Sequence, residues 1–579
     1  MALPHFMSIS TNIPTNIDPQ TGNTRLPHTA TMPTTQKWNM SQALTLNSNP
    51  STQQNLKTEY ANFTDELHIK HAKKLNEVKH SFSKVGEDPL EGLAMIDAVQ
   101  RLGIDYHFHE KIDEVLQRHY TKINTHTCVD NYDDLYEVSL RFRLLRQEGY
   151  YVTAGVFNKF KGKDGMFKEK LKQDIKGLMG LYEASQLRIE QEDVLDDAAN
   201  FSSHILSSWV KHLDHHHQGR NIIRSTLTNP YHKSLARFMV KNFIKDFNGI
   251  NGQGNVLQEL AEMDFKLVQS IHQREILQVS QWWDNLGLAK ELKFARDQPL
   301  KWHMWSMAIL TNSSFSEQRS ELTKPISLIY IIDDIFDVHG TLDELTLFTE
   351  AVNRWDIAAL EHLPDCMKIS FKALYDTTNE IGYKIYKKHG RNPTESLRKA
   401  WATLCNAFLV EAKWFASGHS PKAEEYLKNG VVSSGVHVVL VHVFFLLGHG
   451  LTNESANLVN DIPELMHSVA TILRLWDDLG SAKDENQEGH DGSYVEYYMK
   501  EHQGCSVELA QQHVHNMISD AWKRLNKECL HPNTFPASFK IATLNVARMV
   551  PLMYSYDNNH HLTDLEEQVK QMLYGSVSL

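Results

Sequence analysis

A helical repeat runs through most of this 579-residue chain. Phe108, Ile112, Val115 and His119 follow one another at intervals of four, three and four residues, which places them along one face of an amphipathic helix. Glycine and proline are scarce, at 28 and 17 residues, and this scarcity favours long helices over turn-rich β architecture. We find no convincing run of alternating polar and apolar residues, and no alternation of strands with helices. The sequence therefore predicts an all-α fold.

The length of the chain and one internal break predict two folded domains. A chain this long exceeds what one hydrophobic core normally serves. The segment 248–255 is rich in asparagine and glycine, as flexible connections are. It separates a predicted N-terminal helical domain at 56–247 from a predicted C-terminal helical domain at 256–579. Every strong chemical signal lies after this break.

Residues 1–45 have a different character from the rest. The first part of this segment is rich in threonine, asparagine and proline, and Asp18 is its only acidic residue before Lys37. Such a composition cannot supply a hydrophobic core. It also suits a plastid transit peptide, although Arg25 is its only arginine. We keep two alternatives, a disordered tail and a transit peptide, and correspondingly a cytoplasmic or a plastid location.

The overall charge excludes several classes of function. A net charge of -12 argues against general binding to nucleic acid or to anionic membranes. An anionic substrate would then need metal ions or a local basic patch. The longest apolar candidate for a membrane span, Val436 to Leu447, is too short and contains two histidines, so no span is predicted. Five dispersed cysteines show no zinc spacing and indicate a reducing compartment.

An acidic motif follows a strongly apolar run in the middle of the chain. The run 326–332 must be buried, and it is followed directly by Asp333, with Asp337 four residues further on. On a helix these two carboxylates lie one turn apart on one face, where they repel each other unless a cation lies between them. Oxygen ligands of this kind suit Mg²⁺ or Mn²⁺. Gly340 is typical of a helix end, and Thr341 with Glu344 predicts a capping box for the next helix.

Two further elements complete a predicted anion site. Asp477, Ser481 and Glu485 have i, i+4, i+8 spacing, which puts three oxygen ligands along one helical stripe. Arg474 lies one turn before Asp477, and Arg296 offers a second guanidinium for phosphate oxygens. Acidic helical stripes are usually solvated faces, but together these elements describe a site for a diphosphate held by several Mg²⁺ ions.

These motifs resemble those of plant class I terpene synthases. Asp333-Asp334-x-x-Asp337 is similar to the aspartate-rich motif of that family, and Asp477-Asp478-x-x-Ser481-x-x-x-Glu485 is similar to its second metal motif. Arg296-Asp297-Gln298 stands where the family has an Arg-x-Arg motif. The resemblance covers nearly everything after the first 40 residues or so, and it implies a class I terpenoid synthase bundle at the C-terminus and a degenerate α-barrel-like helical domain at the N-terminus.

The resemblance also implies roles for individual residues. Asp333 and Asp337 would bind two Mg²⁺ ions, and Asp477, Ser481 and Glu485 a third, with Mn²⁺ as a possible replacement. Arg296 and Arg474 would bind the diphosphate of a prenyl diphosphate substrate. The remaining pocket residues implied by the family are an aromatic wall residue, a kink in a pocket helix and a rim tyrosine: Trp305, Ser433-Ser434-Gly435 and Tyr554. We expect a monomer.

Two departures from the family pattern bear on the product. Gln298 replaces the second arginine of Arg-x-Arg, so one diphosphate contact is weakened or comes from elsewhere, for example from Lys301. The Arg-Arg-(eight residues)-Trp motif of many cyclising monoterpene synthases is absent, since Gln36-Lys37 precede Trp38. Both features resemble the subgroup that makes the acyclic alcohols linalool and nerolidol. The alternative is a cyclising mono- or sesquiterpene synthase.

Two other enzyme classes compete with this interpretation. A chain-elongating isoprenyl diphosphate synthase also uses two acidic motifs, but its second motif normally consists of aspartates, whereas Ser481 and Glu485 stand here. A phosphatase of the haloacid-dehalogenase type is remote, because His339 replaces the second aspartate of its motif and the required parallel strands are missing.

Three conspicuous segments have simpler explanations. We interpret His215-His216-His217 as an exposed polar turn and the acidic segment 192–197 as helix-start charge. Trp282 and Trp283 are expected to pack in the core or between domains.

Overall fold

A computed structural model was used to describe the protein. It describes residues 66–82, 89–124, 134–214, 217–246, 254–449, 451–481, 492–532, 535–554 and 563–575. The described residues belong to one compact unit. Helices dominate the described residues, and their only β-type pairing is an isolated bridge between Lys161 and Phe167. The prediction of an all-α fold is confirmed, while the proposed tail at 1–45 lies outside the described residues.

The N-terminal part of the described chain is a group of short helices around one apolar core. The core includes Phe108, Leu116, Phe142 and Leu144, all almost fully buried. Residues 66–82 form the first described helix. The helices that follow are α3 (Pro89–Arg101), α4 (His109–Asn124), α5 (Leu135–Gln147), α6 (Ile175–Ser185), α7 (Asp193–His212), α8 (Gln218–Thr228) and α9 (Ala236–Asp246). The stripe predicted from Phe108 to His119 is the buried face of α4 together with Phe108, which directly precedes that helix, since all its members are less than a tenth exposed.

Buried ion pairs tie the connections of this part to its helices. Arg146 on α5 donates to Val152 O and Leu187 O and pairs with Glu192 through both of its terminal nitrogens. Glu192 precedes α7, and Asp193 and Asp196 lie in the first turn of that helix. The predicted helix-start charge is therefore confirmed, and Glu192 has in addition a structural partner that local spacing could not reveal.

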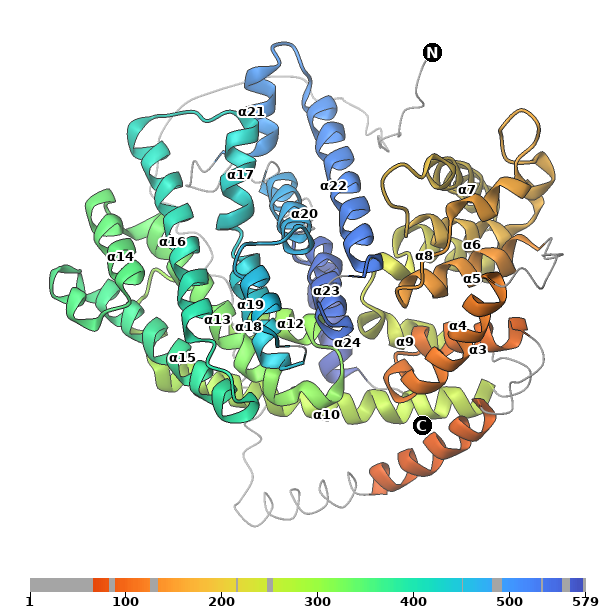
Figure 1. The fold of residues 1–579 in the computed structure, drawn as a ribbon, viewed down its shortest axis with the longest axis horizontal. Helices are drawn as coiled ribbons and strands as arrows, with labels where there is room; N and C mark the ends of the chain where they lie inside the picture. Colours follow the sequence, from red (N-terminus) through yellow and green to blue (C-terminus); the bar gives the residue numbers. More distant parts are fainter. Residues whose placement is uncertain are drawn as a thin grey trace, which may run out of the picture. The chain divides into compact units, whose positions relative to one another are not determined.

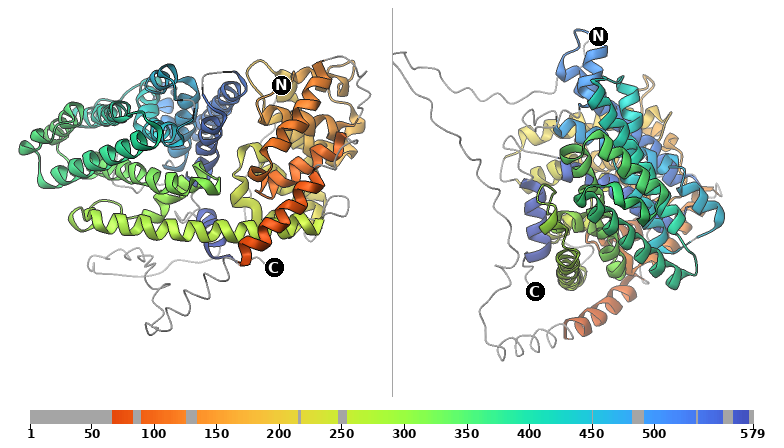
Figure 2. Two further views of the ribbon diagram at one scale, coloured as in Figure 1. Left: turned by 60° about the horizontal axis from the view of Figure 1, so that its bottom comes forward. Right: turned by 90° about the vertical axis from the view of Figure 1, so that its left-hand side faces the viewer.

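The C-terminal part is a bundle of longer helices (Figure 1). It starts with α10 (Gly254–Leu286), which contacts α9 of the N-terminal part as well as α12 and α13 of the bundle, and which passes along both groups of helices in Figures 1 and 2. The other helices are α11 (Leu288–Glu291), α12 (Pro299–Ile309), α13 (Ser316–Asp334), α14 (Leu342–Arg354), α15 (Asp365–His389), α16 (Thr394–Ser417), α17 (Ala423–Ser433), α18 (Val436–Leu447), α19 (Asn453–Val459), α20 (Glu464–Ser481), α21 (Tyr494–Glu501), α22 (Val507–Leu530), α23 (Ala537–Tyr554) and α24 (Thr563–Tyr574).

A buried ionic cluster joins three of these helices. The Glu275 side chain of α10 pairs with Arg319 of α13, whose guanidinium reaches both carboxylate oxygens at 2.7–3.2 Å. His303 of α12 lies 3.3 Å from the same carboxylate, and His272 lies 3.0 Å from it. All four side chains are nearly inaccessible to solvent. The cluster joins α10, α12 and α13, because removal of one charged partner would leave the other charge buried and uncompensated.

Polar contacts also join the two helical groups. Asn526 of α22 donates to Gln186 O and Arg188 O and lies 2.8 Å from His232 Nε2. Lys523 pairs with Asp196 at 3.0 Å. These contacts and the contacts of α10 connect the N-terminal helices to the bundle.

The most apolar segment of the bundle is longer than predicted. The stretch Ala423–Leu447 has 25 residues and enough mean hydropathy to cross a membrane by length and composition alone. The prediction that Val436–Leu447 is the longest candidate was therefore wrong. However, Gly435 breaks this stretch into α17 and α18, and 83% of its most apolar window is buried inside the protein. Such burial is what the core helix of a bundle shows.

The histidine segment at 215–217 and the tryptophan pair at 282–283 lie partly or wholly within the described residues. His217 is exposed and caps α8 by accepting from Gly219 N, as expected for a polar turn, while His215 and His216 lie outside the described residues. Trp283 is buried against Trp302, with ring centroids 4.8 Å apart, which confirms the predicted core position.

Candidate active site

The first acidic motif lies where α13 changes its winding. The α-helix ends at Asp334 and continues as a π-helical turn, Ile335–His339, which contains Asp337. The predicted end near Gly340 is confirmed, as is the capping box of Thr341 and Glu344 at the start of α14. The wider turn was not predicted. It alters the simple one-turn relation of Asp333 to Asp337, and such turns are common at functional sites.

Arg296 supplies the cation that the carboxylates of this motif require. Its guanidinium hydrogen-bonds Asp333, pairs with Asp334 Oδ1 at 2.7 Å, and donates to Tyr330 O at 3.2 Å. Its backbone N–H donates to Asp334 Oδ2 at 2.7 Å. The guanidinium also lies over the Tyr330 ring, 4.8 Å from its centroid. Arg296 therefore joins the segment before α12 to the end of α13.

The residue after Arg296 is held by the core. Asp297 Oδ1 accepts a 2.8 Å hydrogen bond from the buried Trp283 Nε1–H, and Gln298 is the N-cap residue of α12. This hydrogen bond holds Asp297 against the core and so restrains the backbone at the neighbouring Arg296. Trp283 thus supports the site from the core without lining it.

The second acidic motif occupies the last turns of α20. Arg474 lies across the α17 helix, where it donates to Ser433 Oγ at 3.1 Å and to Gly430 O at 3.3 Å. It also pairs with Asp477 at 3.4 Å. A Cβ at Gly430 would lie 3.1 Å from the Arg474 side chain, so Arg474 would have to shift by a few tenths of an ångström to accept a larger residue there.

The last two ligands of the predicted motif have no described side chain. Ser481 is the final residue of α20, and only its backbone is described. Glu485 lies outside the described residues. The placement of these two predicted metal ligands therefore stays a prediction.

The two Asp-Asp pairs share one pattern of exposure. Asp333 and Asp477 have side chains 31% and 38% exposed, whereas Asp334 and Asp478 are only 9% and 2% exposed. Asp478 accepts from Tyr426 O–H and Tyr494 N–H, both at 2.9 Å. Burial raises the pKa of Asp478 to about 7, in spite of the opposing charge of Arg474. In each pair the second carboxylate is buried and binds neighbouring groups of the protein, while the first is partly exposed to solvent.

Lys301 on α12 lies within electrostatic range of Arg296, which binds the first motif, and of Asp477 in the second motif. Burial and the Arg296 guanidinium lower the pKa of Lys301 to about 8, while the Asp477 carboxylate opposes that shift. Tyr330 on α13 feels the charges of both Asp333 and Asp477 in the same way, and burial raises its pKa to about 12. Carboxylates of both acidic motifs therefore act on Tyr330, as expected if the motifs border one site.

Glu411 of α16 is a member of this region that the sequence did not indicate. It accepts hydrogen bonds from Ser433 Oγ at 2.7 Å and Asn429 Nδ2 at 2.9 Å. Burial raises the pKa of Glu411, Arg474 lowers it, and the charge of Asp333 adds to the rise. Glu411 is thus close enough to Asp333 and to Arg474 for both charges to act on its pKa. No motif spacing marks it, because it lies 78 residues from Asp333 in the sequence.

Trp305 and the helix break at 433–435, both predicted as pocket features, lie against α13. Trp305, predicted as a pocket aromatic, is buried on α12 and donates its indole N–H to Tyr330 O–H at 3.2 Å. Ser434 and Gly435 form the break between α17 and α18. Gly435 has φ 71°, and a Cβ there would lie 2.9 Å from Ile329 Cγ2 on α13. The break therefore lies directly against the helix that carries Asp333. Tyr554, predicted at the rim, is the last residue of α23.

The residues present fit a site for hard metal ions. Asp333, Asp337 and Asp477 offer carboxylate oxygens, the donors that Mg²⁺ prefers, and all three are accessible to solvent. Neither histidine nor cysteine is among the described predicted ligands, which disfavours zinc at this site.

Comparison with known proteins identifies the family. Residues 38–227 match "Terpene synthase, N-terminal domain", and residues 284–524 match "Terpene synthase family, metal binding domain". The chain is 62% identical over 504 residues to "Probable terpene synthase 13" of Ricinus communis, covering 86% of this chain and 87% of that one. It is 55% identical over 499 residues to "(E)-nerolidol synthase TPS18VF" of Cannabis sativa, covering 84% and 89%.

A solved structure shows the same fold. Isoprene synthase from grey poplar leaves, in complex with three Mg²⁺ ions and dimethylallyl-S-thiolodiphosphate, superposes with a TM-score of 0.81 at 34% identity, covering 89% of this chain and 99% of that one. The predictions of a class I terpenoid synthase fold and of a lyase acting on prenyl diphosphates are thereby confirmed. This chain belongs to the terpene synthase family.

Proposed function

We propose that this enzyme ionises geranyl or farnesyl diphosphate and adds water to the resulting allylic cation, which yields the acyclic alcohols linalool or nerolidol. The observation that carries the site assignment is the helix break at 433–435, where Ser433 binds Arg474 beside the second motif and Gly435 lies against Ile329, one turn before Asp333 of the first motif. It supports one shared site for both acidic motifs. The product assignment rests on the residues that differ from the family pattern.

We propose that Asp333 and Asp337 hold two Mg²⁺ ions and that Asp477, Ser481 and Glu485 hold a third. When bound, these ions neutralise the negative charge that develops on the leaving diphosphate. The poplar relative, whose structure holds three Mg²⁺ ions together with a diphosphate analogue, supports this number. Mn²⁺ accepts the same oxygen donors and is a possible replacement.

The side chains of this protein have separate tasks in the ionisation step. Arg474 and Arg296 bind and orient the diphosphate, so that the allylic C–O bond breaks and its electron pair leaves with the diphosphate oxygen. Arg296 must turn away from Asp333 for this, because its guanidinium now occupies the carboxylate that is proposed to bind metal. Ser434 and Gly435 form the break between α17 and α18, and Gly435 lies against Ile329 of α13. A movement of α13 would therefore displace this break.

The cation that remains is an allylic carbocation in an apolar environment. The faces of Trp305 and Tyr330 can stabilise its charge. A water oxygen then forms a bond to the tertiary carbon, and the proton released from that water passes to the departed diphosphate. No described side chain of the acidic motifs has to act as a general base in this scheme.

Two observations support an acyclic product. Gln298 stands at the position of the second arginine of the family motif, so Lys301 is the remaining cation near Arg296 on that side. The cannabis relative is named for nerolidol, an acyclic alcohol. We infer that the weaker hold on the diphosphate lets it separate from the cation, so that water captures the cation before it cyclises.

A cyclising activity is the second candidate. "Tricyclene synthase 0e23, chloroplastic" of Antirrhinum majus is 50% identical to this chain over 511 residues, and tricyclene is a cyclic hydrocarbon. The same relative supports a plastid location, and with it geranyl diphosphate as the substrate. A cytoplasmic location is the alternative, and it favours farnesyl diphosphate.

Product analysis with labelled water tests the proposal. The enzyme is incubated with Mg²⁺ and either diphosphate in water enriched in oxygen-18, and the volatile products are analysed by gas chromatography and mass spectrometry. We expect tertiary acyclic alcohols that carry the label, because their oxygen comes from water. Predominantly cyclic hydrocarbons would reject the proposal, and an unlabelled primary alcohol would indicate cleavage of the P–O bond instead. Asp343→Asn, at an exposed aspartate on α14, is a suitable control for variants of the acidic motifs.

A further inference from the structure

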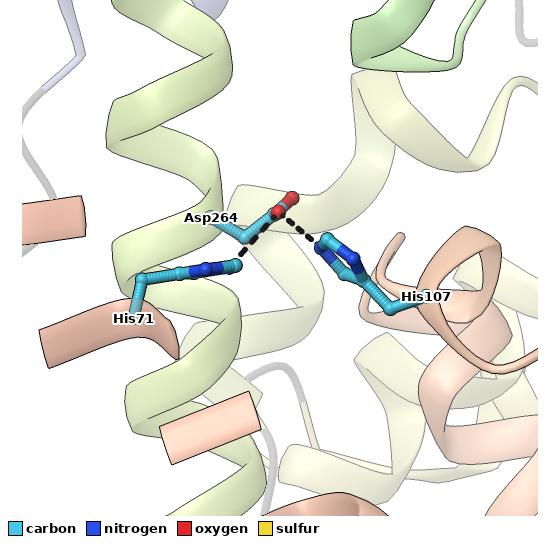
Figure 3. A group of neighbouring side chains, drawn as sticks. All are labelled: His71, His107 and Asp264. Atoms are coloured by element: carbon cyan, nitrogen blue, oxygen red, sulfur yellow. Dashed lines mark hydrogen bonds and ion pairs between the residues drawn. The ribbon is translucent and has the colours of Figure 1, made fainter. Parts of the chain in front are cut away.

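A cluster of two histidines and one aspartate lies away from the acidic motifs (Figure 3). His71 belongs to the helix formed by residues 66–82, and His107 to the single turn Asp105–His107. Asp264 belongs to α10. The cluster therefore joins three segments that are far apart in the sequence, and nothing in the proposed reaction uses it.

The nitrogen and oxygen atoms of this cluster converge on one point. His107 Nε2 lies 2.9 Å and His71 Nε2 lies 3.4 Å from the same oxygen, Asp264 Oδ1. One donor atom from each of the three residues lies within 4.8 Å of the other two. His71 Nε2 is buried and makes no hydrogen bond, although Figure 3 shows its ring directed at the carboxylate. The His71 side chain is 10% exposed and the Asp264 side chain 2%.

The neighbours of Asp264 hold it ionised and oriented. Arg237 donates to the other oxygen, Oδ2, at 3.0 Å, and the Tyr106 hydroxyl donates to Oδ1. Burial alone would raise the pKa of Asp264, but the hydrogen bond from His107, the adjacent His71 imidazole and the charge of Arg237 hold it well below its usual range. An outer partner that fixes a carboxylate through its second oxygen is a common feature of metal sites.

A second cluster of similar composition provides a contrast. His272, Glu275 and His303 also bring three donor atoms within 4.8 Å of one another. There, however, Arg319 binds both oxygens of Glu275, so neither oxygen is left for a metal ion. In the first cluster Arg237 binds only Oδ2, so no guanidinium occupies Oδ1, which faces the two imidazoles and also accepts from the Tyr106 hydroxyl.

We propose that His71, His107 and Asp264 form a binding site for one transition-metal dication of the Zn²⁺ type. Two imidazole nitrogens and one carboxylate oxygen are a ligand set typical of zinc with an open position for water. Mg²⁺ is a poor competitor there, because it prefers oxygen ligands. His107 must present the lone pair of Nε2 to the metal, so the proton that this nitrogen donates to Asp264 moves to Nδ1 or to solvent.

A metal ion bound at this site links the helix formed by residues 66–82 to α10. That helix also packs through Val78 and Phe82 into the core that contains Leu260 of α10, through the apolar group of Leu67, Met263 and Leu267, and through the ion pair of Lys74 with Glu259 at 2.7 Å. A metal ion that binds the folded protein and not the unfolded chain raises the stability of the fold by mass action. The ion is thus structural and independent of the ions that assist ionisation of the diphosphate.

Metal titration of matched variants tests the proposal. The tag-free full-length protein is stripped of metal and titrated with Zn²⁺ in the presence of excess Mg²⁺, with a chromophoric chelator as competitor. The variants are His71→Gln and, as control, His68→Gln, which removes an exposed histidine from the same helix. We expect one more tight Zn²⁺ in the wild type and in His68→Gln than in His71→Gln. We also expect Zn²⁺ to raise the Tm of the first two proteins and not of the third.

The absorption spectrum of the Co²⁺-loaded wild type provides a second measurement that does not depend on the folding of a variant. An intense visible d–d band indicates four- or five-coordinate cobalt and supports the site. A weak octahedral spectrum, or equal Zn²⁺ stoichiometry in all three proteins, would overturn the proposal. Circular dichroism shows whether His71→Gln is folded, and if it is not, the cobalt spectrum and stoichiometry of His68→Gln decide.

Discussion

Replacement of Gly435 by alanine should destabilise the bundle and disturb the site at the same time. Gly435 has φ 71°, a left-handed conformation that costs an L-residue about 1–2 kcal/mol. The new Cβ would also lie 2.9 Å from Ile329 Cγ2 and 3.3 Å from Ile329 Cδ1. Cγ2 moves only by rotation about χ1, which is restricted for isoleucine in a helix, so α13 and the break before α18 must move apart. Overpacking of this kind costs a further ~1–3 kcal/mol.

A matched control isolates the steric part of this effect. Gly390, at the end of α15, has φ 73°, and no atom lies within 4 Å of the position of its Cβ. Gly390→Ala should therefore cost only the ~1–2 kcal/mol of the backbone conformation. Urea unfolding followed by circular dichroism gives the free energies of unfolding. We expect Gly435→Ala to lose ~1–3 kcal/mol more than Gly390→Ala.

The same pair of variants connects packing to activity. Ile329 lies one helical turn before Asp333, so its displacement moves a carboxylate that is proposed to bind metal. We expect kcat/KM to fall in Gly435→Ala and to stay near the wild-type value in Gly390→Ala. Adding Ile329→Ala to Gly435→Ala removes the contact and should give a favourable coupling energy in a double-mutant cycle. Equal losses of stability in the two glycine variants, or no coupling with Ile329, would refute the reasoning.

Three further changes have defined outcomes. Asp333→Asn should lower kcat/KM by the equivalent of roughly 2–4 kcal/mol, because it removes one preorganised charge contact, whereas Asp343→Asn should not; an unchanged turnover would remove Asp333 from the site. Glu275→Gln should lower the free energy of unfolding by roughly 3–5 kcal/mol, since Arg319 is left buried without its charge partner; a loss below that of an exposed pair, about 1 kcal/mol, would contradict this. Lys301→Met should lower kcat/KM below pH 8, where the ammonium is charged. Because the pKa of Lys301 is about 8, the difference from the wild type should shrink as the pH rises through that value, and a pH-independent ratio would count against the charge of Lys301.

Features that depend on near neighbours in the sequence were predicted well. The helical stripe that starts at Phe108, the end of α13 near Gly340 and the capping box of Thr341 all follow from side chains within one or two turns. Such patterns fix which residues share a face and where a helix stops. The two acidic motifs were found for the same reason.

Features that depend on contacts between distant segments could not be predicted. The pairing of Arg296 with Asp333 and the position of Glu411 beside Ser433 arise only when several helices meet. The π-helical turn that carries Asp337 has no spacing rule of its own, so the one-turn relation to Asp333 was too simple. The length of the apolar stretch Ala423–Leu447 was misjudged because Gly435 and the polar residues of α17 interrupt the run of apolar residues in the sequence. In the fold, however, most of this stretch is buried.

A crystal structure of the enzyme with Mg²⁺ and a thiolodiphosphate analogue of geranyl or farnesyl diphosphate tests the central claim most directly. We expect the diphosphate of the analogue between α13 and α20, with metal ions on Asp333 and Asp477 and with Arg296 turned from Asp333 toward the phosphate oxygens. An analogue bound elsewhere, or one whose metal ions contact neither carboxylate, would contradict the claim that the two acidic motifs form one site.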